Sequence, residues 1–253
     1  MSVLRKMLFR VLAVAGCLAV LVFCFKDFTF STLLAPSEWD FCTYRWIEQM
    51  AQLMGADLHF SEFHISLIAT DLSSQFMTHI TTSIYLGLLG ASPYILFELF
   101  RFVSPALYDY ERKYSVRVVV MIYILFIAGV MMSYFIIFPI AFRFLGTYSV
   151  AERVVSTITL DSYIETFTTL TLVLGVVFQL PIVAYLLAKL GLVDAGTLEA
   201  YRRQAALVIA VAAAVITPPD IMSLVLVAVP LYLLYEVSIR VVHYTSVAHS
   251  DKE

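Results

Sequence analysis

Long apolar runs alternate with short polar segments along the whole of this 253-residue chain. A helix needs about twenty apolar residues to cross the roughly 30 Å hydrocarbon core of a bilayer. Six runs are predicted to cross it, at about residues 7–25, 76–100, 114–138, 166–190, 205–216 and 221–239. We therefore expect an all-α integral membrane protein with six transmembrane helices, forming a single polytopic membrane domain over residues 1–253.

The fifth run is the weakest of the six. Its 12 residues reach only about 18 Å as a helix, well short of the hydrocarbon core. The segment Thr217-Pro218-Pro219-Asp220 follows it, and two prolines disfavour a continuous helix into the sixth run. A broken or re-entrant segment is the alternative, but we expect short fifth and sixth helices that cross.

The polar stretch of about residues 26–75 is predicted to be a structured external segment. It is long for a loop, and it mixes acidic side chains with aromatic ones such as Trp39 and Trp46. Trp and Tyr settle at membrane interfaces. We expect this segment to contain helices of its own and to lie at the interface.

Composition and charge support this topology. Of all residues, 61% are hydrophobic and only 14% are charged, whereas soluble domains are about a quarter charged. With the N-terminus inside, 12 of the 16 Lys and Arg residues lie on the cytoplasmic side, while residues 26–75 hold seven acids. The positive-inside rule then places both termini in the cytoplasm.

Two further features of the sequence bear on whether its first run is cleaved and whether the protein is an enzyme. Val14-Ala15-Gly16-Cys17 resembles a lipoprotein cleavage box, but the apolar run continues to Phe25, so a retained helix is expected. The sequence has no G-x-S-x-G, H-E-x-x-H, C-x-x-C or phosphate-binding glycine loop. No enzyme, metal, cofactor or nucleic-acid partner is therefore predicted.

Glu111 is the most informative residue, because it lies in a polar break where Lys and Arg are usual. Pro105 fixes the chain after the second run, and Phe102 and Tyr108 add aromatic surface. Arg112 offers Glu111 a local ion pair as an alternative. A carboxylate beside aromatic rings suits guanidinium groups, so this segment predicts a receptor for a positively charged partner.

Two other polar residues lie within the second and fourth runs. Gln179, before Pro181 in the fourth run, either bridges helices or binds a guest segment. Glu98 is predicted to pair with Arg101 at helical i,i+3 spacing.

The last run has a polar residue near each end. Asp220 is predicted to cap the sixth helix. Glu236 is predicted to pair with Arg240 four residues on.

Taken in order, several short motifs resemble the TatC family of twin-arginine translocase components, from Leu4 to about Tyr244. The motifs are Ala69-Thr70-Asp71, Phe102 to Arg112, Ser133-Tyr134-Phe135, Phe138-Pro139, Gly175 to Pro181, Thr217 to Asp220, and Leu234-Tyr235-Glu236. Each motif is weak alone, and their order and spacing are specific.

The resemblance implies a concave, glove-like receptor in the bacterial cytoplasmic (inner) membrane, driven by the proton gradient. It implies twin-arginine signal peptides of folded cargo proteins as ligands, with TatA- and TatB-type single-span proteins and further copies of the chain as partners. Glu111 matches the family glutamate that contacts the arginine pair, and Arg5 falls within the matching N-terminal segment. Pro36 and Tyr134 also fall on family-pattern positions, and the fifth and sixth helices are where partners dock.

Three departures from the family pattern stand out. Val3-Leu4-Arg5 replaces the end of His-Leu-x-Glu-Leu-Arg, so recognition rests on Glu111 alone or the natural start lies upstream. Gln179 stands where a glutamate is common, and Leu224 where a polar residue is common. The alternative function is a proton-coupled small-molecule transporter, which predicts facing charges in mid-membrane and an internal repeat.

Overall fold

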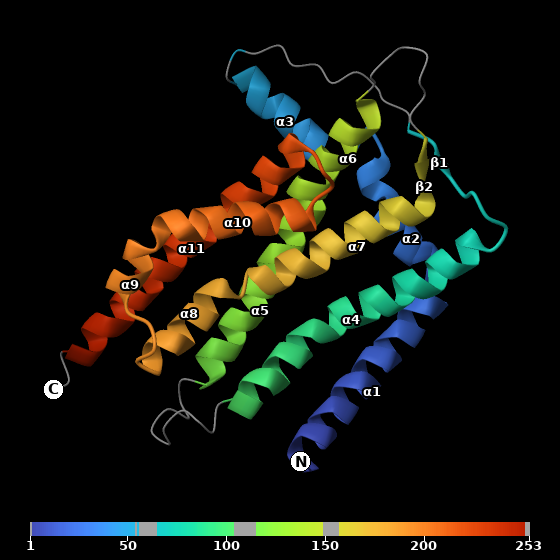
Figure 1. Cartoon of the computed structure of the whole chain (residues 1–253). Coiled ribbons are helices and arrows are strands. Elements are labelled where there is room, and N and C mark those ends of the chain that lie inside the picture. The colour runs from blue at the N-terminus through green and yellow to red at the C-terminus, as the bar shows by residue number, and fades with distance from the viewer. Residues whose placement is uncertain (1, 54, 56–64, 104–114, 149–156, 251–253) are drawn as a thin grey trace. The chain divides into compact units, whose positions relative to one another are not determined.

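The computed structural model describes residues 2–53, 55, 65–103, 115–148 and 157–250, and these are mostly helical (Figure 1). The first part of the chain forms α1 (Ser2–Cys24), α2 (Lys26–Leu34), a 3₁₀ turn η1 (Ala35–Ser37), α3 (Cys42–Leu53) and α4 (Ser74–Val103). Next come α5 (Ser115–Met132), a π-helical turn η4 (Ser133–Ile137) and α6 (Phe138–Thr147). The remainder forms α7 (Leu160–Val177), α8 (Leu180–Lys189), α9 (Ala195–Ala200), α10 (Arg202–Ile216) and α11 (Ile221–Ser250).

Five helical segments within the described residues are long and apolar enough to cross a membrane. They are Leu4–Cys24, Ser74–Leu99, Val118–Thr147, Leu160–Lys189 and Ile221–Tyr244. These segments correspond to five of the six predicted runs. The predicted fifth run is the 15-residue helix α10, which reaches only about 22 Å. The sixth helix is longer than predicted, since α11 continues well past residue 239.

Contacts within the chain group into two compact units. The first unit comprises Met1–Val11, Ala91–Val130 and Thr171–Glu253, and the second comprises Leu12–Gly90 and Met131–Leu170. In the first unit, α11 packs along α8 and α10 (Figure 1). Part of its core joins α5 to α8 through Val118, Ile122 and Ile182. Apolar burial of this kind fixes the register between these helices.

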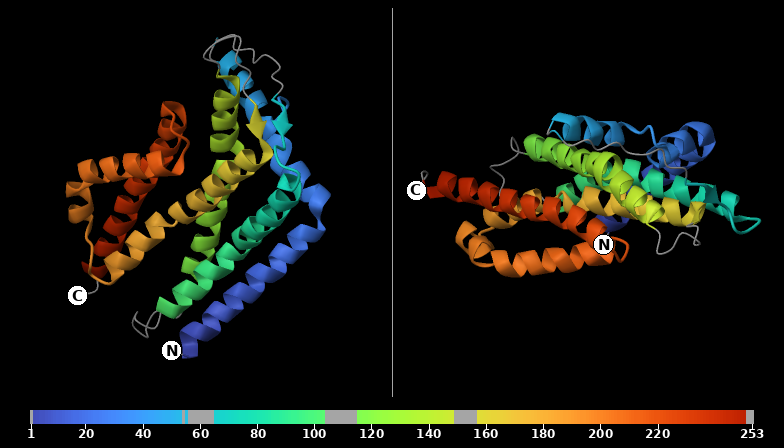
Figure 2. Two further views of the ribbon diagram at one scale, coloured as in Figure 1. Left: turned by 45° about the vertical axis from the view of Figure 1, so that its right-hand side comes forward. Right: turned by 90° about the horizontal axis from the view of Figure 1, so that it is seen from above.

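The second unit holds the predicted external segment, with α2 and α3 beside η4 and α6 (Figure 2). The prediction that residues 26–75 contain helices is confirmed. Its aromatic core places Phe138 edge-to-face on both Tyr163 and Phe167, with ring centroids 5.0 and 4.9 Å apart. A short parallel pair joins β1 (Leu67–Ile68) to β2 (Ile158–Thr159), which the sequence did not predict.

The third membrane segment extends beyond residue 138, where the predicted run ends just before Pro139. It continues to Thr147, because the π-turn at Ser133–Ile137 precedes the proline and leaves it in the first turn of α6. Proline is tolerated there because the first amides of a helix need no intrahelical acceptor.

The fourth membrane segment is broken rather than continuous. Helix α7 ends at Val177, and α8 begins at Leu180 with Pro181 in its first turn. Proline has no N–H to donate, so the helical hydrogen-bond ladder cannot pass through this point unchanged.

Candidate functional site

The predicted peptide-binding loop is only partly covered by the structure. Pro105, Tyr108, Glu111 and Arg112 lie outside the described residues. Phe102 lies in the last turn of α4, although its side chain is not among those described. Arg5 is described, and its side chain lies on the exposed face of α1, beside a cavity.

Gln179 lies at the break between α7 and α8, and its side chain is buried, at 6% exposure. Its Nε2 donates to the backbone oxygen of Ile122 in α5 at 3.2 Å. This contact confirms the helix-bridging interpretation. Its Oε1 is also buried, with no hydrogen-bond partner among the described residues. A buried acceptor without a donor is costly, so this oxygen is available to a polar group that comes within reach.

Pro36 and Tyr134 belong to one tyrosine cluster in the second unit. Tyr44 donates to the carbonyl oxygens of Pro36 at 3.2 Å and Pro139 at 2.9 Å. Burial raises the pKa of Tyr44, which keeps its hydroxyl protonated and able to donate.

Two further tyrosines bind the end of α2. Tyr134 donates to the carbonyl of Thr32 at 2.7 Å, and Tyr163 donates to that of Leu33 at 2.8 Å. Carbonyls in the last turn of a helix lack intrahelical donors. The tyrosines therefore satisfy carbonyls that the helix itself leaves without a donor. This contact gives Tyr134 a structural role, and no sequence pattern had indicated that Tyr44 and Tyr163 belong to the same cluster.

Asp220 caps α11 as predicted. Its Oδ1 accepts from the backbone N–H of Ser223 at 2.7 Å. Its Oδ2 and the hydroxyl of Ser223 are buried without a hydrogen-bond partner among the described residues. The capping bond fixes the turn between α10 and α11.

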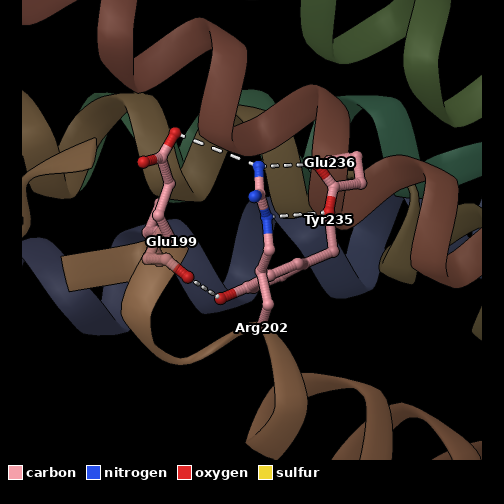
Figure 3. Close-up of polar contacts among 5 residues, drawn as sticks. Glu199, Arg202, Tyr235 and Glu236 are labelled. Atoms are coloured by element: carbon pink, nitrogen blue, oxygen red, sulfur yellow. Dashed lines mark hydrogen bonds and ion pairs between the residues drawn. The ribbon is translucent and has the colours of Figure 1, made fainter. Parts of the chain in front are cut away.

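Glu236 is paired, but the predicted partner was wrong. Its carboxylate binds Arg202 of α10 in a fork, with Nε to Oε1 at 3.0 Å and a second bond of 3.2 Å. Figure 3 shows the Arg202 guanidinium between Glu236 and Glu199. The neighbouring Tyr235 donates to the carbonyl of Leu198 at 2.8 Å. The two bonds of this fork join α10 to α11, a bidentate contact that depends on how the two helices pack.

A buried carboxylate in the first unit also has a partner that the sequence did not reveal. Glu98 is 6% exposed, and its Oε1 accepts from Tyr94 at 3.0 Å and from Arg10 of α1 at 3.4 Å. The side chain of the predicted partner, Arg101, is not among those that the structure describes. The i,i+4 spacing of Tyr94 and Glu98 was readable from the sequence, but a contact spanning 88 positions was not.

These polar groups share one kind of chemistry. Among the described residues, no group of three or more His, Cys, Asp or Glu side chains is placed to hold a metal ion. The polar residues instead join helices or cap helix ends, and the Oε1 of Gln179 has no hydrogen-bond donor among the described residues. Such an arrangement suits a binding scaffold.

The sequence profile of one family, described as TatC, Sec-independent protein translocase protein, matches residues 1–230. TatC of Blattabacterium sp. subsp. Periplaneta americana is 33% identical over 217 residues, which cover 85% of this chain and 82% of that protein. TatC of Carboxydothermus hydrogenoformans is 39% identical over 181 residues, which cover 71% of this chain and 74% of that protein.

Two solved structures are also similar. A crystal structure of the twin arginine translocase receptor TatC is 28% identical, with a TM-score of 0.76 over 97% of this chain and 98% of that one. The same receptor crystallised in DDM gives a TM-score of 0.77 over 95% of this chain and 98% of that one, at 28% identity. TatC proteins are membrane components of a protein translocase, which confirms the prediction of a non-enzymatic transport protein and displaces the small-molecule transporter. The chain belongs to the TatC family of Sec-independent protein translocase proteins.

Proposed function

We propose that this chain is the signal-peptide receptor and scaffold of a twin-arginine translocation system. The system would export folded proteins across the bacterial cytoplasmic membrane with energy from the proton gradient. The observation that carries the proposal is the family match over residues 1–230, supported by the likeness to structures described as twin arginine translocase receptors. In this proposal α10 is the fifth span, both termini are cytoplasmic, and the protein forms a concave receptor.

Glu111 is the proposed contact for the arginine pair of the signal peptide. Its carboxylate would accept charge-assisted hydrogen bonds from guanidinium groups, while Phe102 and Tyr108 supply aromatic faces for stacking. Pro105 and Arg112 would shape the loop around Glu111. A lysine pair would bind less well, because an ammonium group cannot form the planar fork.

The apolar part of the signal peptide would then insert near Gln179 and Pro181. The buried, unpartnered Oε1 of Gln179 supports this assignment, because a backbone N–H of an inserting segment could satisfy it. A glutamine can do so without the cost of a buried charge.

Helices α10 and α11 are the proposed docking surface for TatA- and TatB-type single-span proteins, within a complex containing several copies of this chain. One face of α10 is strongly exposed, at Leu207, Val208, Val211 and Val215 (68%, 65%, 58% and 81%). The Asp220 cap and the Arg202–Glu236 fork support the assignment, since they would hold α10 against α11 while a partner binds. A helix as short as α10 also needs shielding by neighbours or a thinned bilayer.

The test is export of a twin-arginine reporter in cells that depend on this chain. Glu111→Ala and Glu111→Lys are expected to abolish export while membrane insertion, measured by immunoblot of the membrane fraction, stays normal. Asp109→Ala is the matched control, since it removes an acid two positions away in the same loop. Normal export by Glu111→Lys would contradict the proposed site.

A further inference from the structure

A cavity of about 500 Å3 opens beside the start of α1. Its described lining residues are Arg5, Lys6, Phe9 and Arg10. They follow i, i+1, i+4, i+5 spacing, which places them on one helical face. The face thus combines three cations with one aromatic ring, and the ring of Phe9 is 75% exposed.

The charge on this face is not balanced within the described part of the chain. Arg10 has a partner, because its guanidinium reaches the carboxylate of Glu98 at 3.4 Å. Arg5 and Lys6 are exposed and make no ion pair with any described residue. Among the described residues, three cations against one carboxylate leave a net charge of +2 beside the cavity. An anion would compensate it.

The position along α1 indicates which anion is present at that depth. The apolar segment of α1 runs from Leu4 to Cys24, so Arg5 and Lys6 lie at its end, where lipid headgroups begin. Arg10 lies about 7.5 Å further along the axis, where a charge needs a partner such as Glu98. Phe9, between these levels, can contact the acyl chains. Basic pockets beside transmembrane helices at this level fit phosphate headgroups.

We propose that the cavity beside Arg5, Lys6, Phe9 and Arg10 binds the phosphate headgroup of an anionic phospholipid. Arg5 and Lys6 supply the charge that no described carboxylate compensates, and Arg10, held by its pair with Glu98, completes the basic lining. A zwitterionic headgroup binds less well, because its own cation opposes the net +2. The test measures bound lipid rather than export, so its outcome does not depend on the proposed function.

The experiment measures lipid retained by the full-length protein. The protein is reconstituted into nanodiscs of phosphatidylglycerol and phosphatidylcholine in equal amounts, extracted in mild detergent, and its bound lipids are counted by native mass spectrometry. Wild type is compared with Arg5→Gln/Lys6→Gln, in which both side chains are exposed, so that folding is undisturbed. The control Arg203→Gln/Arg240→Gln removes two other exposed cations.

We expect wild type and the control to retain phosphatidylglycerol in preference to phosphatidylcholine. The Arg5→Gln/Lys6→Gln variant should lose about 30-fold of that preference, for two cations near a membrane surface. Equal loss in both double variants would overturn the proposal, since it would mean general charge attraction. Displacement of the lipid by millimolar inorganic phosphate would also overturn it, since the site would then take a free anion.

Discussion

Gly129 in α5 provides a sharp test of the packing in the first unit. A Cβ added there would lie 2.7 Å from the carbonyl oxygen of Leu174, 2.9 Å from the ring of Phe178 and 3.0 Å from the Cα of Gly175. Two of these three atoms are backbone, so no side-chain rotation relieves the contacts. Gly129→Ala therefore requires α5 and α7 to move apart.

The size of the effect follows from two opposing terms. Inserting a methyl group into a filled interface costs about 1–3 kcal/mol. Alanine recovers about 0.8–1.0 kcal/mol over glycine through helix propensity. Gly129→Ala should therefore lower the free energy of unfolding by up to about 2 kcal/mol. Gly16→Ala is the matched control in α1, because a Cβ there meets no atom within 4 Å, and it should be neutral or slightly stabilising.

The assay is unfolding of the purified protein by titration with SDS in mixed micelles, followed by circular dichroism. The midpoint should shift to lower SDS for Gly129→Ala and stay unchanged or rise for Gly16→Ala. A Gly129→Ala protein as stable as Gly16→Ala would refute the close approach of α5 and α7. Equal destabilisation by both variants would show that the effect is not specific to this contact.

Further substitutions test two contacts that the sequence did not reveal. Tyr163→Phe removes the donor to the carbonyl of Leu33 and should cost about 1–3 kcal/mol in the same titration, whereas Tyr201→Phe, at a 56% exposed ring, should cost nothing measurable. Glu236→Gln and Arg202→Gln should each destabilise by no more than about 1 kcal/mol, because the pair is partly exposed. Their double variant should cost less than the sum of the two single variants, and strict additivity would show that the fork is not formed.

The number and order of the apolar helices could be predicted from run length alone. Five of the six predicted runs coincide with segments long enough to span. Local rules also located the Asp220 cap, since the capping residue and the amide that it accepts from are three positions apart. Prediction was weaker where several local outcomes were possible, as at Pro139, where a π-turn lets the helix continue.

Contacts between helices distant in sequence could not be predicted in this way. Glu98 and Glu236 each had a basic residue one turn away, and helical spacing therefore suggested Arg101 and Arg240. The structure brings Arg202 rather than Arg240 to Glu236, and it brings Arg10 to Glu98, while the side chain of Arg101 lies outside the described residues. Which arginine reaches a carboxylate depends on tertiary packing, and one sequence carries no record of that choice.

The predicted peptide-binding loop, by contrast, is supported by the sequence rather than by the structure. Glu111 was identified from its unusual charge and its aromatic neighbours, and from the resemblance of residues 102–112 to the TatC pattern. Its assignment therefore rests on the sequence and on family membership.

Photo-crosslinking from position 108 to a signal peptide directly tests the proposal that Glu111 contacts the arginine pair. A crosslinking residue replaces Tyr108 and leaves Glu111 intact, and peptides with Arg-Arg and Lys-Lys pairs are compared. We expect strong crosslinks with Arg-Arg that disappear with Lys-Lys and with Glu111→Gln. Equal crosslinking of both peptides, or crosslinks that persist in Glu111→Gln, would contradict the assignment of Glu111 as the contact for the arginine pair.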